Sequence, residues 1–181
     1  MKSLINISDK IKLLIVGDGP DLNQYQNYVL KNKLEENIIF TGKVPWNKIN
    51  TYYLISNCFT TASHTETQGL TVIEAMASSL PVVAIDDESF TDTVINGLNG
   101  LIFKNKREYK KCITNLYKDK ELLKKLSSQA RISAETHSSK YFAEQILDVY
   151  KIAIKNKPKH NIPFLEKLHN IIGKEEDKKD E

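Results

Sequence analysis

Short apolar runs alternate with segments of helical periodicity along the first hundred residues of the chain. The first and fourth runs are apolar on both faces, which is typical of parallel strands covered on both sides. The runs predict five β-strands, at residues 12–16, 37–41, 57–62, 81–85 and 100–103. Helical patterns separate them, near residues 21–33, 47–55, 69–78 and 90–96.

This alternation predicts βαβ units and therefore an α/β fold. We expect a doubly wound, mostly parallel, Rossmann-like sheet of five or six strands over residues 10–104, with helices on both faces. Ligands of such sheets bind beyond the carboxyl ends of the strands. The loops in which to look for a site follow Val16, Phe40, Ala62 and Ile85.

Three helices are predicted after the last strand, at residues 106–117, 119–135 and 139–155. Asn105 is a candidate N-cap for the first, and Ser138 or Ser139 for the third. We expect one domain over residues 1–155, incomplete at its N-terminus, and a separate segment over 156–181.

The separate segment begins near two prolines, Pro158 and Pro163. Residues 162–172 carry an apolar stripe at helical spacing, and 173–181 contain only Gly, Lys, Glu and Asp, a composition typical of disorder. An apolar stripe with no place on a complete domain indicates a missing partner surface or a membrane interface. We expect docking on an absent N-terminal domain, with peripheral membrane contact or ordinary packing within this chain as the alternatives.

Charge and cysteine content narrow the function classes. Lys and Arg number 26 against 23 Asp and Glu, a formal charge of +3, with no basic stripe of the kind that nucleic-acid binders show. No apolar run reaches the roughly 18–20 residues of a membrane span, and no secretion signal is visible. Two cysteines, Cys58 and Cys112, make no disulfide framework, so we expect buried thiols and a cytoplasmic protein.

A glycine-rich turn, containing Gly17 and Gly19, follows the first strand directly. Such a turn lets a phosphate approach the backbone. The dinucleotide fingerprint is excluded because Leu22 stands where its third glycine belongs and no acid ends the second strand. A tight turn without a ligand remains the alternative.

Two glutamates, Glu66 and Glu74, stand eight positions apart in the segment after the third strand. The backbone N–H groups of Gly69, Leu70 and Thr71 would be free donors at the start of the next helix, and a helix N-terminus is a ready anion site. The alternative is that both glutamates are ordinary surface residues. His64 is expected to lie in a loop or to be hydrogen-bonded within the core. Trp46 is expected to pack on the core. No group of residues has metal-ligand spacing.

The glutamate pair, followed by Ala-Met-Ala and then Pro-Val-Val-Ala, resembles the nucleotide-sugar domain of retaining family-4 glycosyltransferases of GT-B architecture. The order of motifs over about residues 11–155 is also similar: V-G-D-G-P, F-x-G-x-V, the glutamate pair, and Asn99-Gly100-Leu101. The sequence around Glu66 resembles that of bacterial enzymes that glucosylate diacylglycerol and also that of capsular glycosyltransferases. The chain would then be half of a GT-B fold, located in the cytoplasm or at the inner face of the membrane.

The resemblance implies a role for each matching residue. Glu74 would bind the ribose of a UDP-sugar, and Glu66 would act at the donor sugar as the catalytic residue. Gly69, Leu70 and Thr71 would bind phosphate. Gly42, Lys43 and Val44 would border the base, beside Gly17 and Gly19. No metal or other cofactor is implied. Retention is ascribed in such enzymes to front-face attack, in which the leaving phosphate takes the acceptor proton.

Departures from the family pattern bear on activity. The family places an Arg and a Lys upstream of the first strand and has a whole N-terminal acceptor domain, whereas only ten residues precede that strand here. Leu80 stands where the family has a glycine before Pro81, and Asp92 matches the acid of a later donor-binding turn only loosely. We expect an excised or split enzyme, inactive without its acceptor domain. A non-catalytic sugar-nucleotide-binding subunit that needs a partner chain is the alternative.

Overall fold

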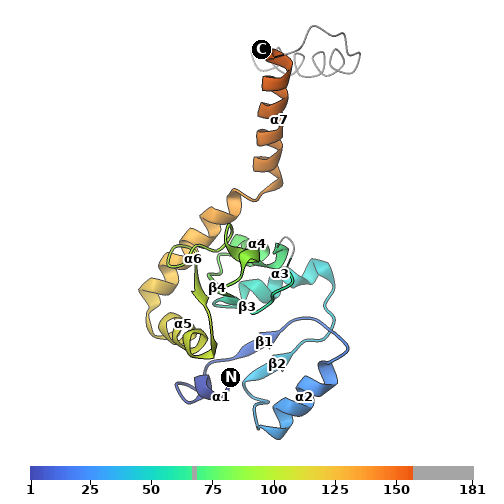
Figure 1. Cartoon of the computed structure of the whole chain (residues 1–181). Coiled ribbons are helices and arrows are strands. Elements are labelled where there is room, and N and C mark those ends of the chain that lie inside the picture. The colour runs from blue at the N-terminus through green and yellow to red at the C-terminus, as the bar shows by residue number, and fades with distance from the viewer. Residues whose placement is uncertain (67–68, 157–181) are drawn as a thin grey trace. The chain divides into compact units, whose positions relative to one another are not determined.

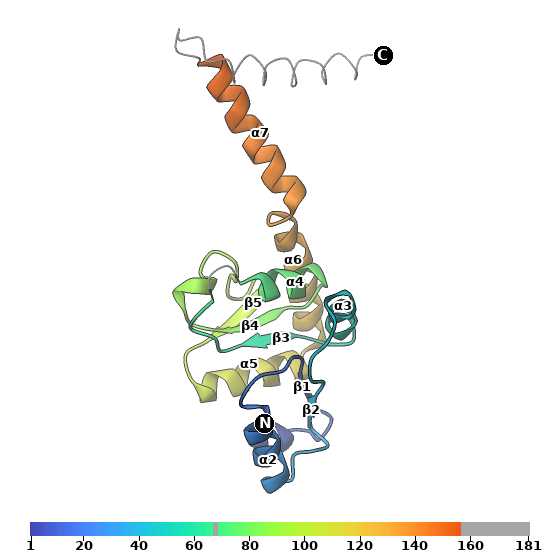
Figure 2. The same ribbon diagram turned by 90° about the vertical axis from the view of Figure 1, so that its right-hand side faces the viewer.

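Strand β4, Val82–Ile85, is the centre of the computed structural model, which describes residues 1–66 and 69–156. Val82, Val83 and Ala84 are fully buried because helices cover both faces of the strand. β4 pairs in parallel with β3, Phe59–Thr61, and with β5, Gly100–Phe103. Figures 1 and 2 show this ladder with helices above and below it.

Alternate residues of β4 face two different cores. Val82 and Ala84 pack with α4, Leu70–Ala77, and α6, Lys120–Glu135. Val83 packs on the opposite face with α5, Lys106–Lys118, and with Leu4 of α1, Lys2–Ile5. The predicted parallel strands with helices on both faces are therefore confirmed.

The first two strands form a second parallel ladder, in which β1, Leu13–Ile15, pairs with β2, Ile38–Phe40. Helix α2, Leu22–Lys31, covers it through a small core of Val29, Leu34 and Ile38. The prediction of one continuous sheet is wrong, since the described strands form separate ladders of two and three. β2 leads through α3, Trp46–Leu54, to β3 in the other ladder.

Two predicted helical details differ from the structure. The helix expected at 90–96 is a single 3-10 turn, η1, Glu88–Phe90, capped by the Asp87 side chain. Its continuation is prevented by Asn99, which is buried and accepts a hydrogen bond from Ile95 N–H while donating to the Thr93 carbonyl and to Ser133 Oγ. α1 was not predicted, because four residues are too few to show a periodicity.

The C-terminal helices are confirmed where the structure describes them. Asn105 Oδ1 accepts from the N–H groups of Arg107 and Glu108, and Ser138 Oγ caps α7, Ser139–Lys155. Residues 1–135 form one compact unit and 136–181 a second. The predicted boundary at residue 155 stays a prediction, and the stripe at 162–172 and the charged tail at 173–181 lie outside the described residues.

A left-handed residue ends α4, and it is Ser79 rather than the neighbouring Leu80. Ser79 has φ +61°, and the Leu80 N–H donates to the Ala75 carbonyl, which closes the helix end. Glycine is the residue favoured at this point of a helix end. The missing glycine of the sequence pattern therefore belongs at position 79, one residue earlier than the sequence analysis placed it.

Replacing Ser79 with glycine is expected to stabilise the chain by about 0.5–1 kcal/mol, because the left-handed conformation costs glycine little. Chemical denaturation measures the change. Ser78→Gly is the matched control: Ser78 has φ −89° and bonds to Asn50 Oδ1, so that variant should be less stable than the parent. Equal destabilisation by both substitutions would contradict the assignment.

Gly100 sits where a side chain has no room. A Cβ there would lie 2.8 Å from Val94 Cγ1 and would also meet the Val82 carbonyl of the paired strand. Gly100→Ala should therefore destabilise the unit by about 1–3 kcal/mol, the usual cost of overpacking. Gly19→Ala is the control, since a Cβ at Gly19 meets nothing within 4 Å. Unfolding in urea compares the two variants.

Candidate functional site

The two glycine-containing loops of the first ladder are joined to each other. Gly17 N–H donates to the Gly42 carbonyl at 3.2 Å, just beyond the carboxyl ends of β1 and β2. Both glycines have positive φ, +134° and +66°, which side chains rarely adopt. Lys43 is exposed and Val44 half-buried beside them, and Gly19 is exposed in the first loop. The loops 17–19 and 42–44 thus form one continuous rim.

The start of α4 presents backbone donors. Gly69 is buried and left-handed, with φ +57°, and it turns the chain into the helix at Leu70. The N–H groups of Leu70 and Thr71 donate to none of the described residues. A helix start of this kind attracts negative charge through its free donors and its dipole. Glu66 lies half-buried in the preceding loop, beyond the end of β3.

Glu74 is held by a residue that the sequence analysis did not single out. The Tyr53 hydroxyl, from the end of α3, donates to Glu74 Oε2 at 3.0 Å. Burial, together with the hydrogen bond and the charge of Glu74, raises the pKa of the Tyr53 hydroxyl, so it remains a donor at neutral pH. The contact fixes the glutamate, which otherwise points from α4 toward solvent.

A groove of about 500 Å³ opens beside this pair, between α3, α4 and α6. Glu74 and Tyr53 line it, together with Trp46 and Arg131. The expectation that Trp46 packs on the core is wrong, since the indole is 81% exposed at the first position of α3. Arg131 donates to the Ala77 carbonyl and brings a cation into the groove, 57 positions along the chain from Glu74, which no motif could indicate.

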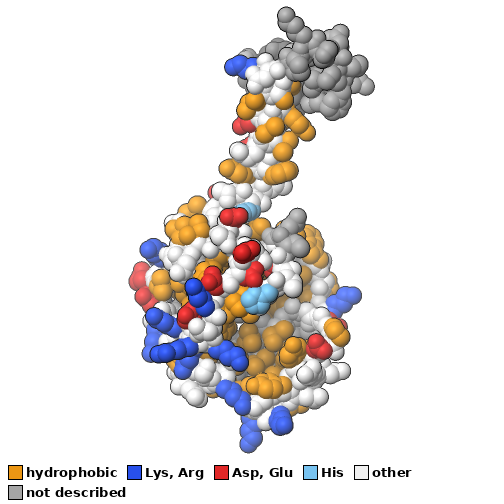
Figure 3. All heavy atoms as spheres, viewed as in Figure 1, with side chains coloured by type: hydrophobic (Ala, Val, Ile, Leu, Met, Phe, Trp, Pro, Cys, Tyr) orange, Lys and Arg blue, Asp and Glu red, His pale blue; other side chains and the backbone are white. Residues whose placement is uncertain are grey.

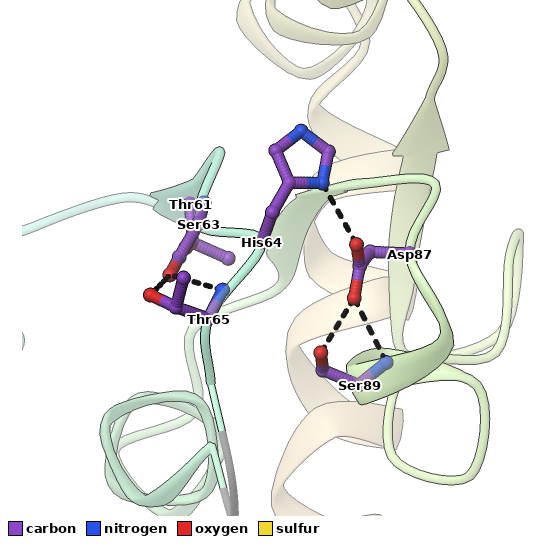
Figure 4. A network of polar contacts seen from close by, with 6 residues as sticks. All are labelled: Thr61, Ser63, His64, Thr65, Asp87 and Ser89. Atoms are coloured by element: carbon purple, nitrogen blue, oxygen red, sulfur yellow. Dashed lines mark hydrogen bonds and ion pairs between the residues drawn. The ribbon is translucent and has the colours of Figure 1, made fainter.

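His64 makes a hydrogen bond across two loops of the second ladder (Figure 4). Its Nδ1 lies 2.7 Å from Asp87 Oδ2, and Ser89 bonds to the other carboxylate oxygen through its hydroxyl and its N–H. Those bonds lower the pKa of Asp87 to about 2, with the Ser89 hydroxyl the largest cause and His64 next. The network holds the loop after β3 against the loop after β4. The loop after β3 continues from His64 to Glu66.

The structure assembles the predicted residues into two groups rather than one. Residues 17–19 and 42–44 belong to the first ladder, and residues 66–74 to the second. Among the described residues no hydrogen bond joins the two groups. The roles assigned to them stay predictions.

Other features of the described residues add no second site. No cluster of three or more His, Cys, Asp or Glu within residues 1–66 and 69–156 could hold a metal ion. A larger hollow, of about 620 Å³, runs along α5 from Asn105 to Asn115 and contains none of the predicted site residues. Cys58 and Cys112 are free thiols, and burial raises the pKa of Cys58 to about 11.

Comparison with known proteins relates this fold to sugar-transferring enzymes. The sequence profile of the family described as "Glycosyl transferases group 1" matches residues 1–133. An "Alpha-monoglucosyldiacylglycerol synthase" of Acholeplasma laidlawii is 34% identical over 151 residues, which are 83% of this chain and 38% of that protein. This chain therefore spans well under half of that relative's length.

Solved structures agree on the fold. The pneumococcal O-GlcNAc transferase GtfA, solved with UDP and GlcNAc, superposes with a TM-score of 0.72 at 21% identity, over 81% of this chain and 30% of that one. The C-terminal domain of a group 1 glycosyl transferase (LpcC) from Francisella tularensis superposes with a TM-score of 0.67 at 24% identity, over 74% of this chain and 73% of that domain. Over the part that the structure describes, no helix is long and apolar enough to cross a membrane.

The Asp87 network predicts a pH-dependent contribution to stability. Because the folded-state pKa of Asp87 is lowered from 3.8 to about 2, the stabilisation is complete above pH 3.8 and is lost as the pH falls through 2. Asp87→Asn should therefore melt at a lower temperature than the parent at pH 7, and the difference should shrink toward pH 2. Thermal unfolding across pH 2–7 measures it.

Asp86→Asn is the matched control for this pH series. Asp86 is the adjacent carboxylate, and its only ion pair in the described residues is an exposed contact with Lys104 at 3.4 Å, a kind that contributes little. Its substitution should leave the melting temperature nearly unchanged. A pH-independent difference for Asp87→Asn would mean that the carboxylate's charge has no part in the effect.

Proposed function

The chain belongs to the group 1 glycosyltransferases, and we propose that it holds the nucleotide-sugar donor of such an enzyme, a UDP-hexose, for retaining transfer. The observation that carries the proposal is the Glu74 carboxylate, fixed by Tyr53 at 3.0 Å beside a helix start with free donors. A nucleotide sugar needs acceptors for its ribose hydroxyls and donors for its diphosphate. Both lie on α4, about one turn apart.

The diphosphate is assigned to the first turn of α4. The N–H groups of Leu70 and Thr71 face no described acceptor, and the left-handed Gly69 leaves the approach clear of a side chain. Phosphates bind at helix starts because free N–H groups and the helix dipole favour negative charge. In this proposal the helix start and basic side chains neutralise the charge of the diphosphate, without a metal ion.

The ribose is assigned to Glu74. Its Oε2 accepts from Tyr53, which leaves Oε1 open to a ribose hydroxyl. The base is assigned to the rim formed by residues 17–19 and 42–44, where the backbone bond between Gly17 and Gly42 holds the two loops together. Lys43 on that rim is exposed and adds a positive charge near the nucleotide.

Glu66 is assigned to the donor sugar. It stands half-buried beyond β3, on the loop that the contact between His64 and Asp87 ties down. In retaining transfer by front-face attack, the bond from the anomeric carbon to the phosphate oxygen breaks while the acceptor oxygen bonds to the same face. The acceptor proton passes to the departing phosphate. Glu66 orients the sugar hydroxyls for that step.

The acceptor is proposed to be a lipid or a polysaccharide of the cell envelope. Support comes from the relative named as a monoglucosyldiacylglycerol synthase, 34% identical over 83% of this chain. Because the chain spans 38% of that relative, we propose that the acceptor is bound by residues outside these 181 and that transfer requires them. Work on a lipid acceptor would place the enzyme at the inner face of the membrane.

Glu74→Gln tests the ribose assignment in the 181-residue chain. The substitution keeps the size of the side chain and removes its charge, and a hydrogen bond to a charged group contributes about 1.5–3 kcal/mol. UDP affinity should therefore fall about 10- to 100-fold, as isothermal titration calorimetry would show. Tyr53→Phe should cause a smaller loss, because it removes only the bond that fixes Glu74.

Glu121→Gln is the matched control for this titration. Glu121 is an exposed glutamate in the first turn of α6 and is not among the residues that line the groove. Its variant should bind UDP like the parent. If Glu74→Gln also binds UDP like the parent, Glu74 does not contact the nucleotide.

A further inference from the structure

The groove beside Glu74 contains an aromatic side chain to which the assignments above give no role. Trp46 is 81% exposed, and it lines the groove together with Glu74 and Tyr53. Figure 3 shows apolar side chains at the surface in the region where Figure 1 draws α3. Tryptophan has a large apolar ring that is highly buried in most folds. An indole left in solvent beside a held carboxylate is a candidate ligand surface.

The chain enters α3 in a fixed conformation. Pro45 precedes Trp46 with φ −58° and ψ 139°, an extended conformation that ends the loop after β2. The proline ring restricts that φ and so limits the directions in which the helix can begin. Trp46 therefore has a defined position, two residues beyond Val44, where the rim formed by residues 17–19 and 42–44 ends.

One face of α3 is turned toward α4. Trp46, Asn50 and Tyr53 recur at spacings of four and three, so they lie on the same side of the helix. Tyr53 donates to Glu74 Oε2 at 3.0 Å, and the Ser78 hydroxyl donates to Asn50 Oδ1 at 3.3 Å. Trp46 continues this row by one more turn.

The two contacts also fix the direction in which the helices pass each other. The end of α3 meets the middle of α4 through Tyr53 and Glu74. The preceding turn of α3 meets the residue that ends α4, through Asn50 and Ser78. Trp46 is a further turn back and therefore lies toward the end of α4. Glu74 stands between the indole and the start of that helix.

A nucleotide has its parts in the same order. Diphosphate, ribose and base are joined in a row, and the proposed function puts the diphosphate at the start of α4 and the ribose at Glu74. The next part in this direction is the base, and the next side chain that offers a ligand surface is Trp46. Its flat ring provides a platform for stacking, which every base can use because every base has a π-face.

We propose that Trp46 is the stacking platform for the base of the donor nucleotide, an inference that rests on the proposed function. The indole packs against one face of the base, and the rim at residues 17–19 and 42–44 borders its edge. Stacking contributes affinity with little preference for one base. Trp46 therefore distinguishes nucleotides from other phosphates, and selection of one base is left to the backbone groups of the rim.

Intrinsic fluorescence tests the contact directly, because Trp46 is the only tryptophan of the chain. UDP and ADP, added separately to the 181-residue chain, should both quench the emission, with a midpoint equal to the Kd from calorimetry. Pyrophosphate, which has no base, should cause no quenching. Absorption by the nucleotides is corrected with free N-acetyltryptophanamide titrated in the same way.

Substitution measures how much the stacking contributes to affinity. Trp46→Ala should weaken UDP binding about 5- to 150-fold, the range for one stacked base, and Trp46→Phe should lose less because it keeps a ring. Any affinity for pyrophosphate should be equal in the parent and the variants. Tyr28→Ala is the matched control: Tyr28 is 56% exposed on α2 and does not line the groove, so this variant should bind UDP like the parent.

Three results would overturn the inference. Unchanged UDP affinity in Trp46→Ala, together with a loss in Glu74→Gln, would remove Trp46 from the site and leave the proposed function standing. An equal loss for UDP and pyrophosphate would mean that the substitution disturbs the fold. A blue shift of the emission with vesicles of phosphatidylglycerol and diacylglycerol, without a response to UDP, would make Trp46 a membrane contact. A parent chain that binds no UDP would contradict the proposed function itself, and this inference with it.

Discussion

Burial of β4 on both faces is the constraint on which the rest of the structure depends. Val82, Val83 and Ala84 are small or branched and have no exposed surface, so α4 and α6 can approach from one side and α5 from the other. β3 and β5 are aligned by pairing with this strand. The loops that carry Glu66, Asp87 and the start of α4 follow β3 and β4. The pairing of these strands therefore sets the distance between the loops.

Elements with a strong local signal could be predicted from sequence, and those decided by single contacts could not. β4 is apolar throughout and α5 and α7 have side-chain caps, so periodicity and capping residues found them. The segment after Phe90 has helical composition, but the Asn99 side chain hydrogen-bonds to the Ile95 N–H and the Thr93 carbonyl. These backbone groups are then not available for a helix. The break between the ladders was invisible, because β1 has the composition of a strand with neighbours on both sides.

The candidate site also combines features that the sequence predicts with contacts that only the structure shows. The Glu66–Glu74 spacing and the glycine turns are sequence features, and the structure puts each beyond the end of a strand or at a helix start. The partners of those residues come from elsewhere: Tyr53 lies 21 positions before Glu74, and Arg131 is 57 positions after it. Trp46 was misplaced because an apolar side chain indicates burial only where a covering surface exists, and α3 leaves the indole 81% exposed.

The buried amide of Asn99 has a mechanical consequence. Its bond to Ser133 Oγ at 3.1 Å anchors the segment between β4 and β5 on the last turns of α6. Any displacement of the end of α6 must therefore break this bond or drag residues 93–99 along. A force on the chain beyond residue 135 is transmitted in this way to the turn that follows Asp87. Displacement of the C-terminal end of α6 therefore moves one wall of the site.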